Sequence, residues 1–304
     1  MHISLKVFFN PVVKWLTHER PLAEVPLSNF ERIRQELKPC DVILIEGRAR
    51  ISDVIKLITQ SPWSHAALYI GRIQDIDDPR TRDIIRQHYD GPANAQLMIE
   101  SDLGLGTVIR PITVYEREHI RICRPKGLVH KDSQDVIRYA LSRLGYDYDV
   151  RQILDLARFL FPWTIMPRRW RSSLFSSNVG GVTKTVCSTL IAESFSFVQF
   201  PILPLVKHED SEKVQLYQCN PKLSVPSLFD YSPYFEIIKY PFIDYSHHEE
   251  YQLQPWTGTS EYGYTKASAY IKLQQPTEQE DGDKPDEVTD KKKAEKPSTF
   301  PPIH

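Results

Sequence analysis

The sequence lacks the paired cysteines from which zinc sites and disulfide frameworks are built. Its 304 residues include only four cysteines, at positions 40, 123, 187 and 219, with no C-x-x-C pair and no regular spacing. Both kinds of site need cysteines at short, defined spacing, so we expect no metal. Isolated thiols are typical of a reducing compartment, where each is a core residue or a nucleophile.

Long apolar runs and an excess of charge of one sign are also missing. No stretch approaches the roughly 20 apolar residues that a membrane span needs, and the N-terminal apolar stretch is broken by Asn10-Pro11 and Lys14. We therefore expect neither a signal peptide nor a transmembrane helix. Lys and Arg number 38 against 39 Asp and Glu, which does not favour nucleic acid as a partner. We expect a cytoplasmic protein, with peripheral contact with the inner membrane as an open alternative.

The remaining composition is that of a globular protein, with 41% hydrophobic and 25% charged residues. We divide the chain into an N-terminal arm (1–26), one globular domain (27–245) and a polar tail (246–304), whose composition predicts disorder. Within the domain, residues 73–95 are polar and contain two prolines. That composition predicts a surface insertion.

Short strands and helices alternate irregularly along the domain. Apolar, β-rich runs predict strands at 41–46, 64–71, 96–101, 107–112 and 119–124. Helical spacing predicts helices at 28–37, 51–58, 136–144, 150–160 and 187–198. Ser28 and Glu31 have the spacing of a capping box, which predicts Ser28 as the N-cap of the first helix.

Cys187 begins the clearest helical pattern. Leu190, Ile191, Phe195 and Val198 follow it at helical spacing, so the thiol lies in the first turn of an amphipathic helix. The free backbone N–H groups and the positive end of the helix dipole stabilise a thiolate there, and the thiolate is the nucleophilic form. The same pattern is compatible with a cysteine that fills the core. The other three cysteines lack this context, and we expect them to be structural.

A histidine and a carboxylate stand where they can act on this thiol. His65 begins an apolar strand and shares a face of it with Ala67 and Tyr69. Glu100 lies near the end of another strand. If the two strands pair, its carboxylate can orient the imidazole and select its tautomer; Asp102, on the same face, is the reserve candidate. The alternatives are a structural histidine and a carboxylate that caps an exposed strand end.

Four short motifs follow one another in an informative order. They are Cys40-Asp-Val-Ile-Leu-Ile-Glu-Gly47, Gln60-Ser-Pro-Trp-Ser-His-Ala-Ala-Leu-Tyr-Ile-Gly71, Ile99-Glu100 and Val186-Cys-Ser-Thr-Leu-Ile191. This order resembles the circularly permuted branch of the papain-like NlpC/P60 superfamily, and more closely the YiiX/YebB-like cysteine hydrolases, or lipo-like proteins. The resemblance covers residues 38–205, and residues 231–238 also fit it. Cys40 stands where that group usually has glycine.

The resemblance implies an α+β, circularly permuted papain-like fold, in which a small antiparallel sheet packs against helices and the nucleophile lies at a helix N-terminus. It also implies roles for three residues: Cys187 as the nucleophile, His65 as the base and Glu100 as the group that orients the imidazole. The backbone N–H of Cys187 is one candidate oxyanion donor. Further candidates for the oxyanion hole or the substrate pocket are Ser64, Tyr69 and Ser188.

These residues predict a cysteine hydrolase that cleaves an amide, either peptide or acyl amide, or an acyl ester through a thioester on Cys187. It needs no cofactor, and its substrate is a small molecule, a peptide or an acyl lipid. One alternative is an acyltransferase that uses the same thiol. Another is a catalytically silent module that binds lipid or protein.

Two segments are candidates for contact with a membrane surface. Residues 154–175 mix Phe and Trp with four arginines, a composition that suits an anionic bilayer or a lid over an acyl chain. An ordinary core helix followed by a loop is the alternative. The apolar pattern within the N-terminal arm either lies in a membrane interface or packs on its own domain.

Overall fold

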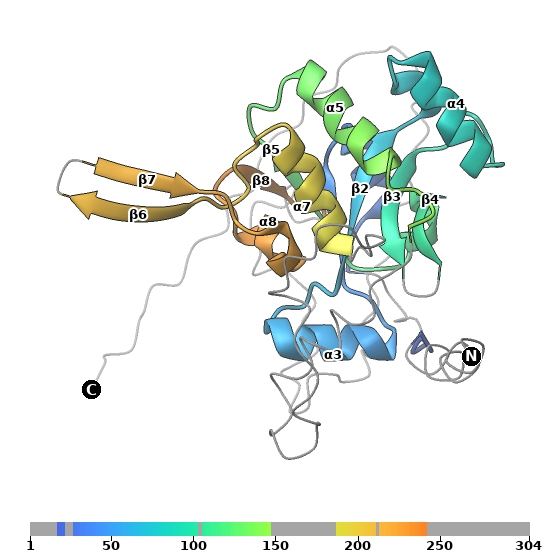
Figure 1. Ribbon diagram of the computed structural model, residues 1–304. Helices are drawn as coiled ribbons and strands as arrows, with labels where there is room; N and C mark the ends of the chain where they lie inside the picture. Colours follow the sequence, from blue (N-terminus) through green and yellow to red (C-terminus); the bar gives the residue numbers. More distant parts are fainter. Residues whose placement is uncertain (1–16, 22–26, 103–104, 147–186, 211–212, 242–304) are drawn as a thin grey trace, which may run out of the picture. The chain divides into compact units, whose positions relative to one another are not determined.

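The computed structural model describes residues 17–21, 27–102, 105–146, 187–210 and 213–241 (Figure 1). The chain divides into two units after Tyr245, and all of the predicted tail lies outside the described residues. The helix predicted at 150–160, the 154–175 segment and most of the N-terminal arm lie outside them as well. The described residues belong to the first unit.

Six strands form one antiparallel sheet in the order β4-β3-β2-β1-β5-β8. The strands are β1 (Val42–Ile45), β2 (His65–Gly71), β3 (Leu97–Asp102), β4 (Gly106–Pro111), β5 (Ile120–Pro125) and β8 (Phe235–Ile238). Each of the first five lies within one residue of a predicted run. The antiparallel sheet and its helices confirm the α+β class.

The helices are α2 (Phe30–Glu36), α3 (Arg50–Thr59), α4 (Pro79–His88), α5 (His130–Leu141), α7 (Cys187–Phe197) and α8 (Ser227–Tyr231). Single 3-10 turns are η1 (Ile73–Asp75), η2 (Ile112–Tyr115) and η4 (Pro221–Leu223). Strands β6 (Leu205–Asp210) and β7 (Lys213–Tyr217) form a separate hairpin that extends away from the main sheet (Figure 1).

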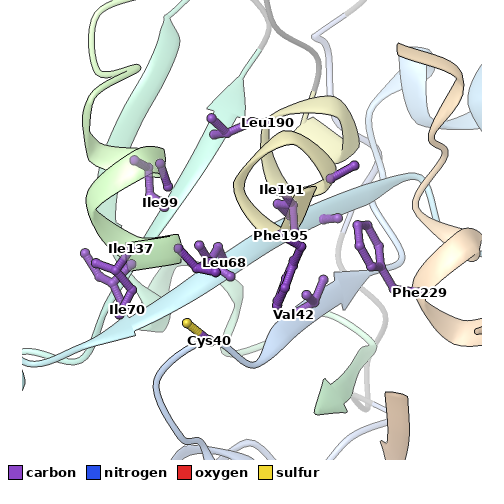
Figure 2. Close-up of a cluster of buried hydrophobic side chains, with 14 of the residues drawn as sticks. Cys40, Val42, Leu68, Ile70, Ile99, Ile137, Leu190, Ile191, Phe195 and Phe229 are labelled. Carbon is purple, nitrogen blue, oxygen red and sulfur yellow. The ribbon is translucent and has the colours of Figure 1, made fainter. Parts of the chain in front are cut away.

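The alternation of side chains along β2 separates the core into two layers. Leu68 and Ile70 point to the face that α5 and α7 cover, where Ile191 and Phe195 of α7 pack against them and their neighbours (Figure 2). Tyr69 lies in the other layer, which α2 covers. This period-two pattern was visible in the sequence. Because α7 is fixed by its apolar face, its first residue is held over the sheet.

Residues 73–95, which the sequence predicts as a surface insertion, are attached to the core by three isoleucines. Ile73, Ile76 and Ile85 are buried in the same layer as α5 and α7. Asp78 caps α4 by accepting hydrogen bonds from the backbone N–H groups of the first turn, and Pro79 occupies its first position. The many charged residues of this segment lie on its outer face. Only a few apolar residues are needed to attach the segment to the core, and they are hard to recognise in such a polar sequence.

The predicted N-cap was also displaced by one residue. Asn29 caps α2, and its side-chain oxygen accepts a hydrogen bond from the N–H of Arg32. The hydroxyl of Ser28 is instead buried against β5, where it accepts from the N–H of Ile120 at 2.9 Å. Ser28, which the capping-box spacing favoured as the N-cap, therefore makes a tertiary contact instead of capping the helix.

Cys40 enters β1 with a φ of 72°, in the region that favours glycine. This is the position at which the resemblance leads one to expect glycine. The thiol is fully buried, 3.2 Å from the carbonyl oxygen of Ser133, and burial raises its pKa to about 12. These features suit a structural residue and not a nucleophile.

Candidate active site

Cys187 is the first residue of α7 and is almost completely buried. The helix is held on the sheet by Leu190, Ile191 and Phe195, all fully buried (Figure 2). The first backbone N–H groups of a helix have no partner within it. At a helix start, such donors can stabilise negative charge on a sulfur or on a nearby oxygen.

His65 is the first residue of β2, and its imidazole lies between Cys187 and Glu100. Its Nε2 is 2.6 Å from Oε2 of Glu100, and the thiol of Cys187 interacts with the same imidazole. Burial lowers the pKa of His65, but the charge and hydrogen bond of Cys187 and those of Glu100 outweigh burial and hold it well above its usual value. This environment favours an imidazolium beside the thiol.

Glu100 is a fully buried carboxylate on β3, the strand that pairs with β2. Burial raises its pKa, but the hydrogen bond and charge of His65, the hydroxyl of Tyr115 and the charge of Arg110 together lower it below the usual value. Tyr115 donates to Oε2 at 2.7 Å, and Nη1 of Arg110 lies 3.3 Å from Oε1. The residue is thus an anion that can hold an imidazolium in place.

Tyr115 and Arg110 were not identified from the sequence. Tyr115 lies on η2, and Arg110 lies on β4. Neither belongs to a periodic pattern or a motif that points to Glu100, and the pairing of β3 with β4 is what brings Arg110 close to it. Asp102, the reserve partner for His65, forms an ion pair with Arg110 at 2.8 Å instead.

The three further candidates for the oxyanion hole or the substrate pocket have different surroundings. The hydroxyl of Ser188 is buried and donates to the carbonyl oxygen of Ser224 at 2.6 Å, so it is not available to an oxyanion. Tyr69 is a core residue, and its hydroxyl accepts from the side chain of Gln96. The hydroxyl of Ser188 is thus committed to Ser224, and Tyr69 lies in the core layer that α2 covers. Ser64 lines a cavity beside His65.

No family model and no curated protein matches the sequence. One similar solved structure is that of YiiX from Escherichia coli O157:H7, which is described as a metalloprotein with the family label DUF1105. It is 14% identical, with a TM-score of 0.40, and the match covers 67% of this chain and 97% of YiiX. A likeness at this level carries no evidence about activity.

Two further features are absent from the described residues. Within them, no group of three or more His, Cys, Asp or Glu side chains is arranged to hold a metal ion. No helix in the same part of the chain has both the length and the apolar character needed to cross a bilayer.

One segment near the end of the domain contacts both the helix that carries Cys187 and the chain just before His65. Ser224 accepts the hydrogen bond of Ser188, the second residue of α7. Asp230 accepts from the indole N–H of Trp63, two residues before His65, at 3.1 Å, and it pairs with Arg121 at 2.6 Å. The 224–230 segment therefore fixes the start of the cysteine helix and the start of the histidine strand relative to each other.

A cavity of about 470 Å³ opens beside His65. It is lined by the loop that leads into α3, by α3 itself, by Asp102 and Leu105 and by η2. Ser64, His65 and Tyr115 belong to its wall, whereas Cys187 does not. The cavity has the size of a small-ligand site.

Proposed function

We propose that this chain is a cysteine hydrolase that cleaves an amide or an acyl ester. The observation that supports the proposal is the hydrogen-bonded series Cys187–His65–Glu100, which combines a thiol at a helix start, a base and a buried carboxylate. These three groups have the relations that nucleophilic catalysis needs: a nucleophile within reach of a base, and a third group that orients the base.

The chemistry follows from these positions. The sulfur of Cys187, with its proton taken by His65, attacks the carbonyl carbon of the substrate, and a C–S bond forms. His65 gives the proton to the leaving nitrogen or oxygen, the bond to that atom breaks, and a thioester remains. Water then loses a proton to His65 as it adds to the thioester, and the C–S bond breaks. Throughout these steps, Glu100 keeps the imidazole in place, and Tyr115 keeps the carboxylate of Glu100 in place.

The test is the rate at which iodoacetamide alkylates each cysteine as a function of pH, measured by peptide mass spectrometry. We expect Cys187 to react well below pH ~8.5, where an ordinary thiol is half ionised. Cys219, which is partly exposed, serves as the comparison within the same chain. His65→Ala should abolish the early reaction. His119→Ala is the matched control, because His119 also pairs with a glutamate, Glu46, at 3.0 Å.

The opposite result has a definite meaning. If the alkylation rate of Cys187 rises over the same pH range as that of Cys219, or if His65→Ala leaves its pH dependence unchanged, the thiol is not activated and the hydrolase proposal fails. The catalytically silent binding module would then be the better account. Acyl transfer differs from hydrolysis only in the acceptor that reaches the thioester, and product analysis in the presence of alcohols distinguishes the two.

A further inference from the structure

The start of strand β2 is held by a tryptophan that lies two residues before His65. Trp63 is 1% exposed. The guanidinium carbon of Arg121 lies 4.7 Å from the centroid of its ring, and the ring centroid of His119 lies 5.1 Å from it. The indole N–H, which can only donate, bonds to Oδ2 of Asp230 at 3.1 Å. A buried side chain held both by its ring and by its N–H leaves the adjacent backbone little freedom, so Trp63 constrains the position of His65.

Asp230 is itself a fixed acceptor for this N–H. Nη1 of Arg121 lies 2.7 Å from one oxygen of its carboxylate and 2.6 Å from the other. Its neighbour in α8, Phe229, is fully buried in the core layer that also contains Phe195 of α7 (Figure 2). The carboxylate is therefore held by β5 and the backbone by the core. Because neither is free to follow the indole, the hydrogen bond fixes Trp63 relative to α8.

The segment that carries Asp230 also bonds to the helix that carries Cys187. The hydroxyl of Ser188, the residue after Cys187, donates to the carbonyl oxygen of Ser224 at 2.6 Å. Ser224 comes only six residues before Asp230, and most of the chain between them is the helical turn of α8. A short, ordered piece of chain thus spans from the cysteine helix to the tryptophan that precedes the histidine.

The separation of thiol and imidazole matters because a hydrogen bond weakens steeply with distance and misalignment. Resting on the proposed function, we propose that Asp230 is a positioning residue of the site. Through Trp63 it holds His65 at the distance from Cys187 at which the thiol gives its proton to the imidazole. It acts through the indole, and in this it differs from Glu100, which bonds the imidazole directly.

The experiment measures how fast iodoacetamide alkylates Cys187 in the full chain as the pH rises. Asp230→Ala removes the acceptor of the indole N–H together with one negative charge, and Trp63→Phe removes the donor with no change of charge. Each should move the pH at which Cys187 becomes reactive toward that of an ordinary thiol. Each should also lower its rate at pH 7 by roughly fivefold, the scale of coupling within one hydrogen-bond network. The double variant should lower the rate no further than the larger single effect, because both substitutions break the same bond.

Asp41→Ala is the matched control. Asp41 also pairs with an arginine of β5, Arg124, at 2.8 Å, so the substitution removes the same charge and lowers the free energy of unfolding in urea. Asp41 immediately precedes β1, whereas His65 is opposite Ile45 at the other end of that strand. The alkylation rate of Cys187 at pH 7 should therefore stay within about twofold of the wild type.

Three results overturn the inference. The first is a Cys187 that keeps its pH dependence in Asp230→Ala. The second is an equal change in Asp41→Ala, which would assign the effect to lost charge or lost stability. The third is a pair of independent, additive effects of Asp230→Ala and Trp63→Phe, since Asp230 would then not act through the indole.

The buried thiol of Cys40 shows whether a variant has kept its fold. If Cys40 becomes reactive in Asp230→Ala, that variant has opened, and Trp63→Phe decides alone: unchanged alkylation in it overturns the inference. A wild-type Cys187 that titrates with Cys219 rejects the hydrolase proposal and this inference with it. An activated wild-type thiol that neither substitution changes rejects only the positioning role.

Discussion

Glu100→Gln is the substitution that most directly tests the electrostatics of the site. The side chain is fully buried and keeps its size, but it loses its charge. Oε2 accepts from His65 at 2.6 Å and from Tyr115 at 2.7 Å. If the glutamine oxygen takes that place, its NH₂ group must face Arg110, whose Nη1 lies 3.3 Å from Oε1 and is itself a donor.

The magnitude follows from the hydrogen bond that is lost. A hydrogen bond to a charged group contributes about 1.5–3 kcal/mol, and about 1.4 kcal/mol corresponds to a factor of ten. Without the carboxylate, the imidazolium that accompanies the thiolate is less stable. We therefore expect the alkylation rate of Cys187 at pH 7 to fall roughly tenfold or more, and a far-ultraviolet spectrum to show that the fold is kept.

The control is Glu46→Gln, which removes the charge from the other glutamate that is paired with a histidine. Glu46 lies 3.0 Å from Nδ1 of His119 and is half-buried. It should leave alkylation of Cys187 within about twofold of the wild type, since it does not contact His65. An unchanged rate in Glu100→Gln, or an equal decrease in both variants, would refute this account of the site.

Two further predictions concern stability. Phe195→Ala should lower the free energy of unfolding by about 3–5 kcal/mol, because the ring is fully buried against Phe200 and Phe235; urea unfolding measures this, and a loss below ~1 kcal/mol contradicts the packing described. The pKa of Glu100 is lowered in the fold, so its ionisation stabilises the protein above pH ~4.3 and this contribution disappears as pH falls through the lower folded value. The stability difference between wild type and Glu100→Gln should therefore narrow in acid, and a difference that is constant from pH 7 to pH 3 would contradict this.

Much of the secondary structure could be read from the sequence because it depends on local patterns. The alternation from His65 to Gly71 separates Ala67 and Tyr69 from Leu68 and Ile70, and the structure places the two sets in different core layers. The helix that contains Cys187 follows from apolar residues at helical spacing, and α7 covers Cys187–Phe197 of the predicted 187–198. Periodicity acts over a few residues, so a single sequence reveals it.

Pairing of distant residues was decided only by the tertiary structure. The sequence contains two carboxylates that could pair with His65, Glu100 and Asp102. The register of β3 against β2 and β4 brings Glu100 into contact with the imidazole and brings Asp102 into an ion pair with Arg110. Asp230 is 167 residues from Trp63 in the chain, yet it accepts the indole N–H. No local pattern encodes such a contact.

The corrections have the same physical origin. Ser28 has the right spacing for a cap, but its hydroxyl hydrogen-bonds the backbone of β5, and Asn29 caps the helix. Ser188 stands beside Cys187, but its hydroxyl donates to the carbonyl oxygen of Ser224. The sequence by itself determined which residues can form strands and helices and which of them carry reactive groups. The tertiary structure decided which partner each polar side chain has, because a buried hydrogen-bonding group must find a partner and the nearest one in space is often far away in the chain.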